Sequence, residues 1–417
     1  MNDQLFVHYQ QLVIGRLRRN EPSQMRFEYD DGWRTQPDAF PISLSLPLDG
    51  LFNPSAGHNF FANLLPEGAV RELICRSLGI SQGNDFELLR AIGGDCAGAL
   101  SLSESSEPEA EPSFPVYEPV KDEQLAQWSR GTPRAFSDVT GQNEVRLSLA
   151  GAQDKLPVHV RGEQIFIPLA RTPSTHILKF ASPYYSHLPE NEAFTTMLAR
   201  AVGLPAVDIS LRQTPAARVA VIARYDREPF EGIFRRVHQE DFCQALGLSP
   251  SAKYEKEGGP SIRQCADLIR QHTSFPLVEL KKLLDWVLFN LLIGNADAHA
   301  KNLSLLYHDN SSIALAPFYD LVCTRNYPKI SRHLAMNVGG MSDPDLIRSD
   351  HLRSLAADLQ IHSRVVLRSV SEMIERITNS LPSVTDQFVE MYGQSPVIER
   401  LPLVIRKQIR RIAQQLN

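Results

Sequence analysis

The sequence lacks the features that mark several common classes of protein. Its five cysteines are scattered, with no Cys-x-x-Cys pair, which excludes a disulfide framework and a zinc-ribbon site and fits reduced thiols in a cytosol: Cys75, Cys96, Cys243, Cys265 and Cys323. No apolar run approaches the about 18 residues that a membrane-spanning helix needs. The N-terminus has no basic segment leading into an apolar one, so no signal peptide is expected. We therefore expect a cytoplasmic protein without a membrane anchor.

An excess of positive charge is also missing. The chain has 43 Lys and Arg against 48 Asp and Glu, a formal net charge of −5. A free-standing nucleic-acid-binding protein would usually be basic. With 417 residues, 43% of them hydrophobic, the chain is long enough for two or three domains with large cores. No internal repeat is evident, so we expect a globular protein of several different domains.

The pattern along the first part of the chain indicates a small α+β domain followed by a linker. Within residues 1–103, the first 50 or so residues are rich in β-formers, and the pattern from Asn59 to Gly79 is helical. A second helix is expected over Asp85 to Ile92, followed by a strand at AGALSL. Residues 104–122 are acidic and proline-rich, with little that could enter a core. We expect a linker or an exposed loop there.

The remaining chain reads as two further parts, giving an α+β fold with two lobes. In residues 123–229 we expect a strand, a turn and a strand over 145–160, then a strand carrying Lys179. A helix over Glu190 to Val202 and strands near 207–211 and 219–225 follow. Helices dominate residues 230–417, including one that carries Val366 to Leu381. This order is that of a kinase small lobe and helical large lobe, although the first part is also a common α+β order.

The stretch from Leu283 to Asp320 combines a predicted core helix, a polar loop and a predicted hairpin. It opens with a helix that is apolar almost all round, as expected in a domain core, and Gly294 is placed to end it. The polar loop 295–302 follows. Two apolar runs, 303–307 and 313–318, are joined by turn-forming residues and predict a β-hairpin. Because a hairpin returns the chain to where it left, we expect Asp320 to lie beside Asn302 and Asp297.

Two acids and an amide at the end of a buried helix suit phosphoryl transfer from a nucleotide. That reaction needs Mg²⁺ held by hard oxygen ligands, and a carboxylate that orients or deprotonates the attacking hydroxyl. The D-x-x-x-x-N spacing, a hairpin and a further Asp make Asp297 the candidate base and Asn302 and Asp320 the candidate metal ligands. The alternative is that Asp297 and Asn302 only satisfy the backbone of a loop.

Other candidate residues for phosphate binding lie earlier in the sequence than Asp297, Asn302 and Asp320. Lys179 on a strand could neutralise phosphates, with Glu192 on the next helix holding it in place; a solvated lysine at a strand end is the alternative. The segment from Ser148 to Lys155 could cover phosphates with backbone N–H groups, because Gly151 permits close approach; a plain hairpin turn is the alternative.

Two further features of the sequence are His299 and a group of basic residues near the C-terminal end. His299 has no His or Cys partner at metal-ligand spacing, and we expect it to brace the loop. The basic residues between Arg400 and Arg411 lie on a predicted helix. They form a solvated face, with contact to nucleic acid as the alternative.

Together these segments closely resemble the HipA family of serine/threonine kinase toxins from bacterial toxin–antitoxin pairs, over essentially the whole chain. The most specific matches are LSLAGAQDK (147–155), HILKF (176–180), NEAF (191–194), ARYDR (223–227), HQEDFCQALG (238–247), GNADAHAKN (294–302) and FYDL (318–321). The D-x-H-x-x-N loop also looks like that of the phosphoinositide kinases. The chain has no G-x-G-x-x-G motif and no D-F-G motif, and members of the HipA family usually lack both.

The resemblance implies a role for each matching position. Asp297 matches the catalytic aspartate, Asn302 and Asp320 the Mg²⁺ ligands, and Ser148 a serine that these kinases autophosphorylate to shut off ATP binding. The segment near the protein-substrate side matches Gln239, Glu240 and Asp241. ATP-binding positions are implied at Ser148, Ala150, Gly151, Ala152, Gln153, Lys155, Lys179, Ala223, Tyr225, His299 and Lys301, with Ala223 and Tyr225 where the hinge backbone meets adenine.

The resemblance also implies partners and leaves two other functions open. The usual partner is a small helix-turn-helix antitoxin, HipB, that binds operator DNA with the toxin. The best-known target is glutamyl-tRNA synthetase, and other members phosphorylate other translation-linked proteins. One alternative is a kinase of a small molecule, since the D-x-H-x-x-N loop also serves such enzymes. Another is a nucleotide-binding co-repressor that mainly holds an antitoxin on DNA.

Overall fold

The computed structural model describes residues 3–21, 24–107, 115–130, 139, 153–169, 172–182, 184–231, 233–308 and 312–416. The chain divides into two compact units. Unit 1 comprises residues 1–184, 212–250 and 305–312, and unit 2 comprises residues 185–211, 251–304 and 313–417. Each unit therefore gathers segments that are far apart in the sequence.

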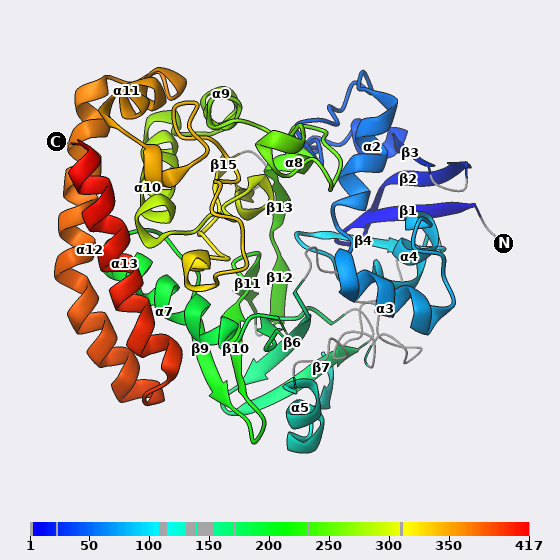
Figure 1. Ribbon diagram of the computed structural model, residues 1–417. Coiled ribbons are helices and arrows are strands. Elements are labelled where there is room, and N and C mark those ends of the chain that lie inside the picture. Colours follow the sequence, from blue (N-terminus) through cyan, green and yellow to red (C-terminus); the bar gives the residue numbers. More distant parts are fainter. Residues whose placement is uncertain are drawn as a thin grey trace. The chain divides into compact units, whose positions relative to one another are not determined.

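Unit 1 begins with a four-stranded antiparallel sheet in the order β3-β2-β1-β4 (Figure 1). Its strands are β1 (Gln4–Tyr9), β2 (Leu12–Glu21), β3 (Gln24–Tyr29) and β4 (Leu100–Ser103). Alternate residues such as Leu5, Val7 and Phe27 are buried, which gives the sheet one apolar face. The helices between β3 and β4 are α1 (Asp31–Arg34), α2 (Pro54–Ala62), α3 (Gly68–Leu78) and α4 (Asp85–Ile92).

The helices of this part agree with the sequence except at one break. The helix predicted over Asp85 to Ile92 is confirmed as α4, and Gly79 ends α3 in the left-handed conformation with φ 68°. The predicted run from Asn59 to Gly79 is wrong as one helical segment, because α2 ends at Ala62 and α3 begins at Gly68. Pro66 lies in the gap, and a proline disfavours helical geometry in the residue before it.

A second sheet has six strands in the order β5-β7-β6-β8-β10-β9. They are β5 (Val116–Pro119), β6 (Lys155–Arg161), β7 (Gln164–Leu169), β8 (His176–Lys179), β9 (Ile209–Gln213) and β10 (Arg218–Ala223), and α5 (Asp122–Trp128) follows β5. The strands predicted near 176–180, 207–211 and 219–225 are confirmed as β8, β9 and β10. The strand predicted over 145–149 lies outside the described residues.

Part of the acidic, proline-rich segment is a strand rather than a linker. Val116–Pro119 pairs antiparallel with β7, opposite Leu169 to Phe166. In the strand order β5 is terminal, and prolines are tolerated at a sheet edge because one side of the strand makes no ladder hydrogen bonds. Composition therefore identified the solvent-facing character of this segment but not its pairing.

A buried ion network ties the loop after α4 to the chain that follows β10. Asp95 is 2% exposed and accepts hydrogen bonds from Arg227 Nη2 at 2.8 Å, Arg236 Nε at 3.0 Å and Ser174 Oγ at 2.8 Å. Asp226 bonds Arg224 Nη2 at 2.6 Å and the Gly98 N–H at 2.7 Å. Burial alone would raise the pKa of Asp95, but the charges of the three arginines hold it well below its usual range.

The remaining strands are short. The hairpin of β11 (Arg227–Phe230) and β12 (Ile233–Arg236) carries two of the arginines of the network. β13 (His238–Asp241) leads into α8 (Phe242–Ala245). Strand β13 also starts a three-stranded sheet in the order β13-β14-β15, with β14 (Ser304–His308) and β15 (Ser312–Leu315).

Unit 2 is built around the helix that the sequence placed in a core. α10 runs over Pro276–Ile293 and buries Leu283, Leu284, Trp286 and Leu288 among other residues. It packs against α9 (Ile262–His272), α12 (Ser363–Tyr392) and α13 (Pro396–Leu416). In Figure 1, α12 and α13 run alongside each other, and both also pack on α7 (Leu188–Ala201). The predicted core helix is confirmed, and it starts earlier than its most apolar part because Pro276 occupies its first turn.

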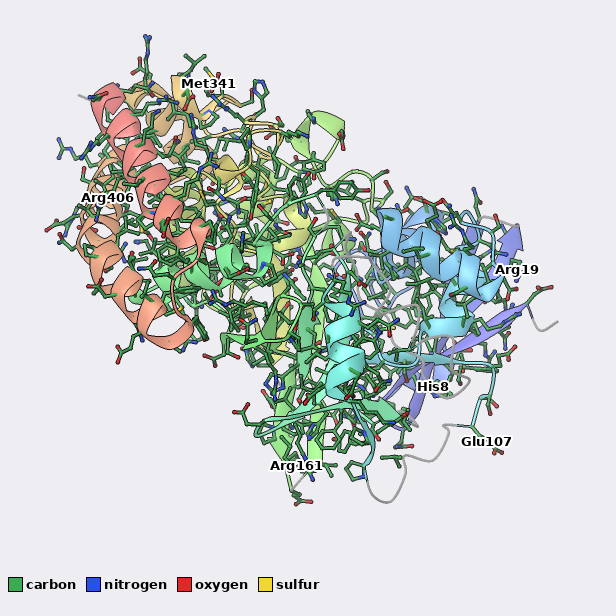
Figure 2. The ribbon with its side chains drawn as sticks, turned by 60° about the horizontal axis from the view of Figure 1, so that its bottom comes forward. His8, Arg19, Glu107, Arg161, Met341 and Arg406 are labelled. Atoms are coloured by element: carbon green, nitrogen blue, oxygen red, sulfur yellow. The ribbon has the colours of Figure 1, made fainter. Side chains whose placement is uncertain are left out.

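The remaining elements of unit 2 are short or lie near the C-terminal end. They are η1 (Glu255–Glu257), η2 (Ala300–Asn302), η3 (Thr324–Asn326), η4 (Pro344–Leu346) and α11 (Ser349–Asp358). The helix predicted to carry Val366 to Leu381 is confirmed within α12. On α13, Arg406, Lys407 and Arg410 are exposed, and Figure 2 shows the labelled Arg406 on the outside of that helix. None of the helices in the described part of the chain has the length and apolar character to cross a bilayer.

We predict that Asp95→Asn destabilises the protein strongly. The substitution removes one of the two carboxylates that pair with the buried Arg224 and Arg227, and removing one partner from a buried ion pair costs about 3–5 kcal/mol. The midpoint of urea unfolding measures the effect. Asp208→Asn is the matched control, because Asp208 is 71% exposed and pairs with Arg200 at the surface. Equal midpoints for the two variants would contradict a structural role for the network.

Candidate active site

The loop after α10 is fixed to the helix end by backbone and amide hydrogen bonds. Gly294 ends the helix with φ 76°. Asn295 is 2% exposed, donates from Nδ2 to Asn290 Oδ1 at 2.8 Å and accepts the Asp297 N–H at 3.1 Å. The Ala296 N–H donates to Thr324 Oγ1 at 2.8 Å, and the Ala296 carbonyl accepts from the Ala335 N–H at 2.9 Å. Asp297 therefore stands on a rigid turn.

Asp297 and Asn302 present different groups from this turn. The Asp297 carboxylate is exposed and accepts a hydrogen bond from the Tyr254 hydroxyl at 2.7 Å. Asn302 is 6% exposed, and its Nδ2 donates to the Asp297 carbonyl oxygen at 3.1 Å. Because the amide nitrogen is used in this way, Oδ1 is the atom of Asn302 that can ligate a cation. An exposed carboxylate and an oriented amide oxygen thus come from one short loop.

The predicted hairpin is confirmed as β14 and β15, and it returns the chain to the loop. The Ala316 N–H donates to the Ser304 carbonyl at 2.9 Å. The Tyr319 hydroxyl donates to the Lys301 carbonyl at 2.7 Å and lies 2.7 Å from Ser304 Oγ. Tyr319 precedes Asp320 and Lys301 precedes Asn302, so the chain neighbours of the two candidate metal ligands are in direct contact.

Asp320 stands in a strained backbone conformation between two anchored segments. Its φ of 55° is in the left-handed region, which non-glycine residues rarely adopt and which is often found at functional sites. On one side, Phe318 exchanges backbone hydrogen bonds with Pro205 and Val207 at 2.8 and 3.0 Å. On the other, Asn191 of α7 donates to the Cys323 carbonyl at 3.1 Å and accepts its N–H at 2.9 Å. These contacts anchor the backbone on both sides of Asp320.

The side-chain oxygen atoms of the two candidate metal ligands fit Mg²⁺. Asn302 and Asp320 offer hard oxygen atoms, which Mg²⁺ prefers, and that ion keeps several ligands for water and phosphate. Among the residues that the structure describes, no group of three His, Cys, Asp or Glu side chains could hold a metal ion by itself.

The candidate phosphate-binding residues lie in unit 1, where two lysines are cross-strand partners. Lys155 of β6 is paired with Lys179 of β8, and Lys179 is paired with Ala220 of β10 on its other side. Directly opposed residues share a face of the sheet, so both ammonium groups are on one face. Lys179 is 5% exposed. The two candidate phosphate-binding lysines are therefore neighbours at the start of β6.

The expected phosphate loop is only partly described. Gln153 Nε2 donates to the Phe180 carbonyl at 3.0 Å, and the Phe180 N–H donates to the Asp154 carbonyl at 3.1 Å, which anchors the end of the loop to β8. Ser148, Ala150, Gly151 and Ala152 lie outside the described residues.

The expected hinge follows β10 and leads into the ion network. Ala223 is paired with His176, and the next N–H, that of Arg224, donates to the Thr175 carbonyl at 2.9 Å. The Tyr225 hydroxyl donates to Gln239 Oε1. Because Arg224 is buried in the network with Asp95 and Asp226, the backbone between the two hinge candidates is held firmly.

All three positions expected near the protein substrate make internal contacts in unit 1, Gln239 through the hydrogen bond from Tyr225. Glu240 is fully buried and accepts hydrogen bonds from Ser43 Oγ at 2.5 Å, the Leu44 N–H at 3.1 Å and the Tyr307 hydroxyl. Burial raises the pKa of Glu240 to about 7. Asp241 caps α8 by accepting the Gln244 N–H at 2.9 Å.

The remaining expected residues are buried. His299 is 8% exposed, precedes η2, and its ring is edge-on to Tyr254 with centroids 5.3 Å apart. Lys301 is 7% exposed, and its carbonyl accepts from Tyr319. Glu192 lies on α7 in unit 2 and is 1% exposed, whereas Lys179 belongs to unit 1.

Sequence reasoning missed several residues that position this site. Tyr254 lies 43 residues before Asp297 in an irregular loop, and no periodic pattern points to their contact. Thr324 and Thr195 hold backbone groups of residues 294, 296 and 321 through their hydroxyls, and a threonine gives no such signal in a sequence. Asn191 was visible only as part of the NEAF motif.

Comparisons with known proteins agree with the resemblance that the motifs suggested. A family model of the HipA-like C-terminal domain matches residues 147–383, and one of the HipA N-terminal domain matches residues 5–103. The Y4mE protein of Sinorhizobium fredii is 34% identical over 392 residues, 92% of each chain. The serine/threonine-protein kinase toxin HipA of Shewanella oneidensis is 32% identical over 397 residues, 91% of this chain and 89% of that one.

A solved structure supports the same assignment through the fold. The chain of the Shewanella oneidensis HipA, HipB and operator DNA complex superimposes with a TM-score of 0.83 and 28% identity, covering 98% of this chain and 97% of that chain. The expected α+β, two-lobed fold is therefore confirmed. The match of both domain models and the similarity over nearly the full length lead to one conclusion. The chain belongs to the HipA family of serine/threonine-protein kinases.

Proposed function

We propose that this protein is an ATP-dependent serine/threonine protein kinase that acts as the toxin of a toxin–antitoxin pair. It would halt growth by phosphorylating a translation-linked protein, an aminoacyl-tRNA synthetase being the class that family precedent suggests. The proposal rests on the loop at the end of α10. This loop carries the exposed Asp297 carboxylate and the oriented Asn302 amide. The chain that follows the β14–β15 hairpin contacts the same loop just before Asp320. The name of the Shewanella oneidensis relative supports the proposal.

Each residue has a chemical role in this proposal. Asp297 accepts the proton of the attacking hydroxyl, and Asn302 Oδ1 and the Asp320 carboxylate hold Mg²⁺. When bound, the metal ion neutralises charge on the phosphates. The backbone of 148–153 with Lys155, Lys179 and Lys301 binds the phosphate groups, and the backbone at Ala223 and Tyr225 faces the adenine ring. His299 braces the loop through its contact with Tyr254.

The proposal includes a functional division of the chain and its partners. Residues 1–103 form the N-terminal subdomain, 104–122 the connection, 123–229 the small lobe and 230–417 the large lobe. The antitoxin would be a HipB-like helix-turn-helix protein through which the kinase reaches operator DNA, as the content of the Shewanella oneidensis complex suggests. The segment 239–241 lies toward the protein substrate in this proposal, with Glu240 and Asp241 stabilising its conformation. The protein would act in the cytoplasm.

We predict that Asp297→Gln abolishes phosphate transfer and toxicity while leaving ATP affinity nearly unchanged. A positioned base contributes about 10²–10⁴-fold to the rate, and glutamine cannot take up the proton. Transfer is measured with γ-labelled ATP, Mg²⁺ and a bacterial lysate, and toxicity by growth after induced expression.

The outcome separates the proposal from its two alternatives. Label on lysate proteins with wild type, but not with Asp297→Gln, supports a protein kinase. Label only on small metabolites would indicate a small-molecule kinase, and absence of turnover would indicate a nucleotide-binding co-repressor. Normal growth at verified high expression of active wild type would contradict the toxin role in that host.

We predict that Asp320→Asn weakens the binding of Mg·ATP. Asparagine tolerates the left-handed backbone of this position but loses the negative charge that attracts the cation. Affinity should fall about tenfold to a hundredfold, as when partners of a metal site are removed. Calorimetry with and without Mg²⁺ measures the effect, which should vanish without the ion. Asp350→Asn is the control, because that carboxylate is 89% exposed. Equal Mg·ATP affinity in both variants would refute the ligand assignment.

We predict that Ser148 is the self-inhibition site. Phosphorylation adds about −1.5 to −2 charge at neutral pH, which would repel the triphosphate and compete for the same backbone N–H groups and lysines. Ser148→Ala should remain active during incubation with Mg·ATP, whereas Ser148→Asp should be weak from the start. Mass spectrometry follows the phosphate, and active wild type that never carries it on Ser148 would disprove the switch.

A further inference from the structure

We propose that Tyr254 is a positioning residue for phosphoryl transfer, holding the Asp297 carboxylate in the orientation that accepts the substrate proton. The inference rests on the proposed function, because it assigns Asp297 as the base. Its starting point is the hydrogen bond of 2.7 Å from the Tyr254 hydroxyl to Asp297 Oδ1. Among the described residues, Tyr254 is the one side chain that hydrogen-bonds this carboxylate.

The backbone around Tyr254 is fixed to the same loop that carries Asp297. The Lys253 carbonyl accepts the Ala300 N–H at 3.3 Å, and the Glu255 N–H donates to the Ala335 carbonyl at 2.9 Å. The Ala335 N–H in turn donates to the Ala296 carbonyl, one residue before Asp297. The Glu255 carboxylate accepts the Asn337 N–H at 2.6 Å and its Nδ2 at 3.0 Å. Three separate segments are thereby held together around the base.

The ring of Tyr254 is also restrained. It meets His299 edge-on, with an interplanar angle of 89° and centroids 5.3 Å apart. The ammonium groups of Lys253 and Lys256 lie 5.6 and 5.9 Å from its centroid, within cation–π distance. These contacts involve the ring and not the hydroxyl. Removal of the hydroxyl alone therefore leaves the packing intact, which makes its role separable by experiment.

The chemistry of the bond explains why it would matter. Asp297 is exposed, so its carboxylate would otherwise rotate among several orientations in water. A hydroxyl donating to Oδ1 directs the lone pairs of Oδ2 to the substrate. In the transfer step the substrate hydroxyl oxygen bonds to the γ-phosphorus and its proton passes to Oδ2. The bond from that phosphorus to the β,γ-bridging oxygen breaks, and ADP leaves with the electron pair. Tyr254 keeps its own proton throughout.

Tyr254→Phe tests the inference with γ-labelled ATP, Mg²⁺ and a fixed amount of bacterial lysate as acceptor. We expect the maximal rate to fall about tenfold to a hundredfold, the range for a hydrogen bond to a charged group. The KM for ATP and the thermal midpoint should be unchanged, since ring contacts remain. Tyr184→Phe is the matched control, because Tyr184 is 81% exposed, and it should match wild type.

A double-variant comparison distinguishes this inference from the proposed function. In the Asp297→Gln background, Tyr254→Phe should cause no further loss, because both act on one proton transfer. If Asp297→Gln is inactive but Tyr254→Phe keeps the wild-type maximal rate, the inference is overturned while the proposed function stands. A fall in maximal rate accompanied by a lower thermal midpoint and a raised KM for ATP would also overturn it, since that pattern indicates a structural role. Full activity of Asp297→Gln would overturn both.

Discussion

The turn at Gly294 is the constraint on which the rest of the site depends. A buried helix must stop there and release a polar loop, and the left-handed φ of 76° achieves this without strain only for glycine. A Cβ atom at this position would lie 2.9 Å from the Arg325 Cβ. That closeness exists because the Gly294 carbonyl accepts the Arg325 N–H at 3.0 Å and the Thr324 hydroxyl at 3.1 Å. One turn thus joins the loop of Asp297 to the segment that follows Asp320.

The two units hold different kinds of polar and charged groups. In unit 2, the short loops that carry the candidate metal ligands are anchored to buried helices, as the segment after Asp320 is by the bonds of Asn191 to Cys323. Unit 1 gathers cations, with Lys155 opposite Lys179 on one sheet. It compensates its own buried arginines with Asp95 and Asp226.

Local patterns predicted the parts of the fold that local forces determine. α4, α10 and the β14–β15 hairpin follow from apolar spacing and turn residues, and they were predicted with their type and approximate bounds. The pairing of Val116–Pro119 with β7 was not, because an edge strand depends on a distant partner rather than on its own composition. The contact of Tyr254 with Asp297 and the full burial of Glu240 are likewise tertiary facts. Motif matches named site residues, but only the folded chain shows what supports them.

We propose that Asn302 and Asp320 hold the cation that accompanies the nucleotide. The most direct measurement is a crystal structure of the full chain with Mn²⁺ and a non-hydrolysable ATP analogue, using anomalous scattering to locate the metal. We expect an anomalous peak about 2.1 Å from Asn302 Oδ1 and from an Asp320 carboxylate oxygen, with phosphate oxygens completing the shell. A nucleotide bound with its metal away from both residues would contradict it.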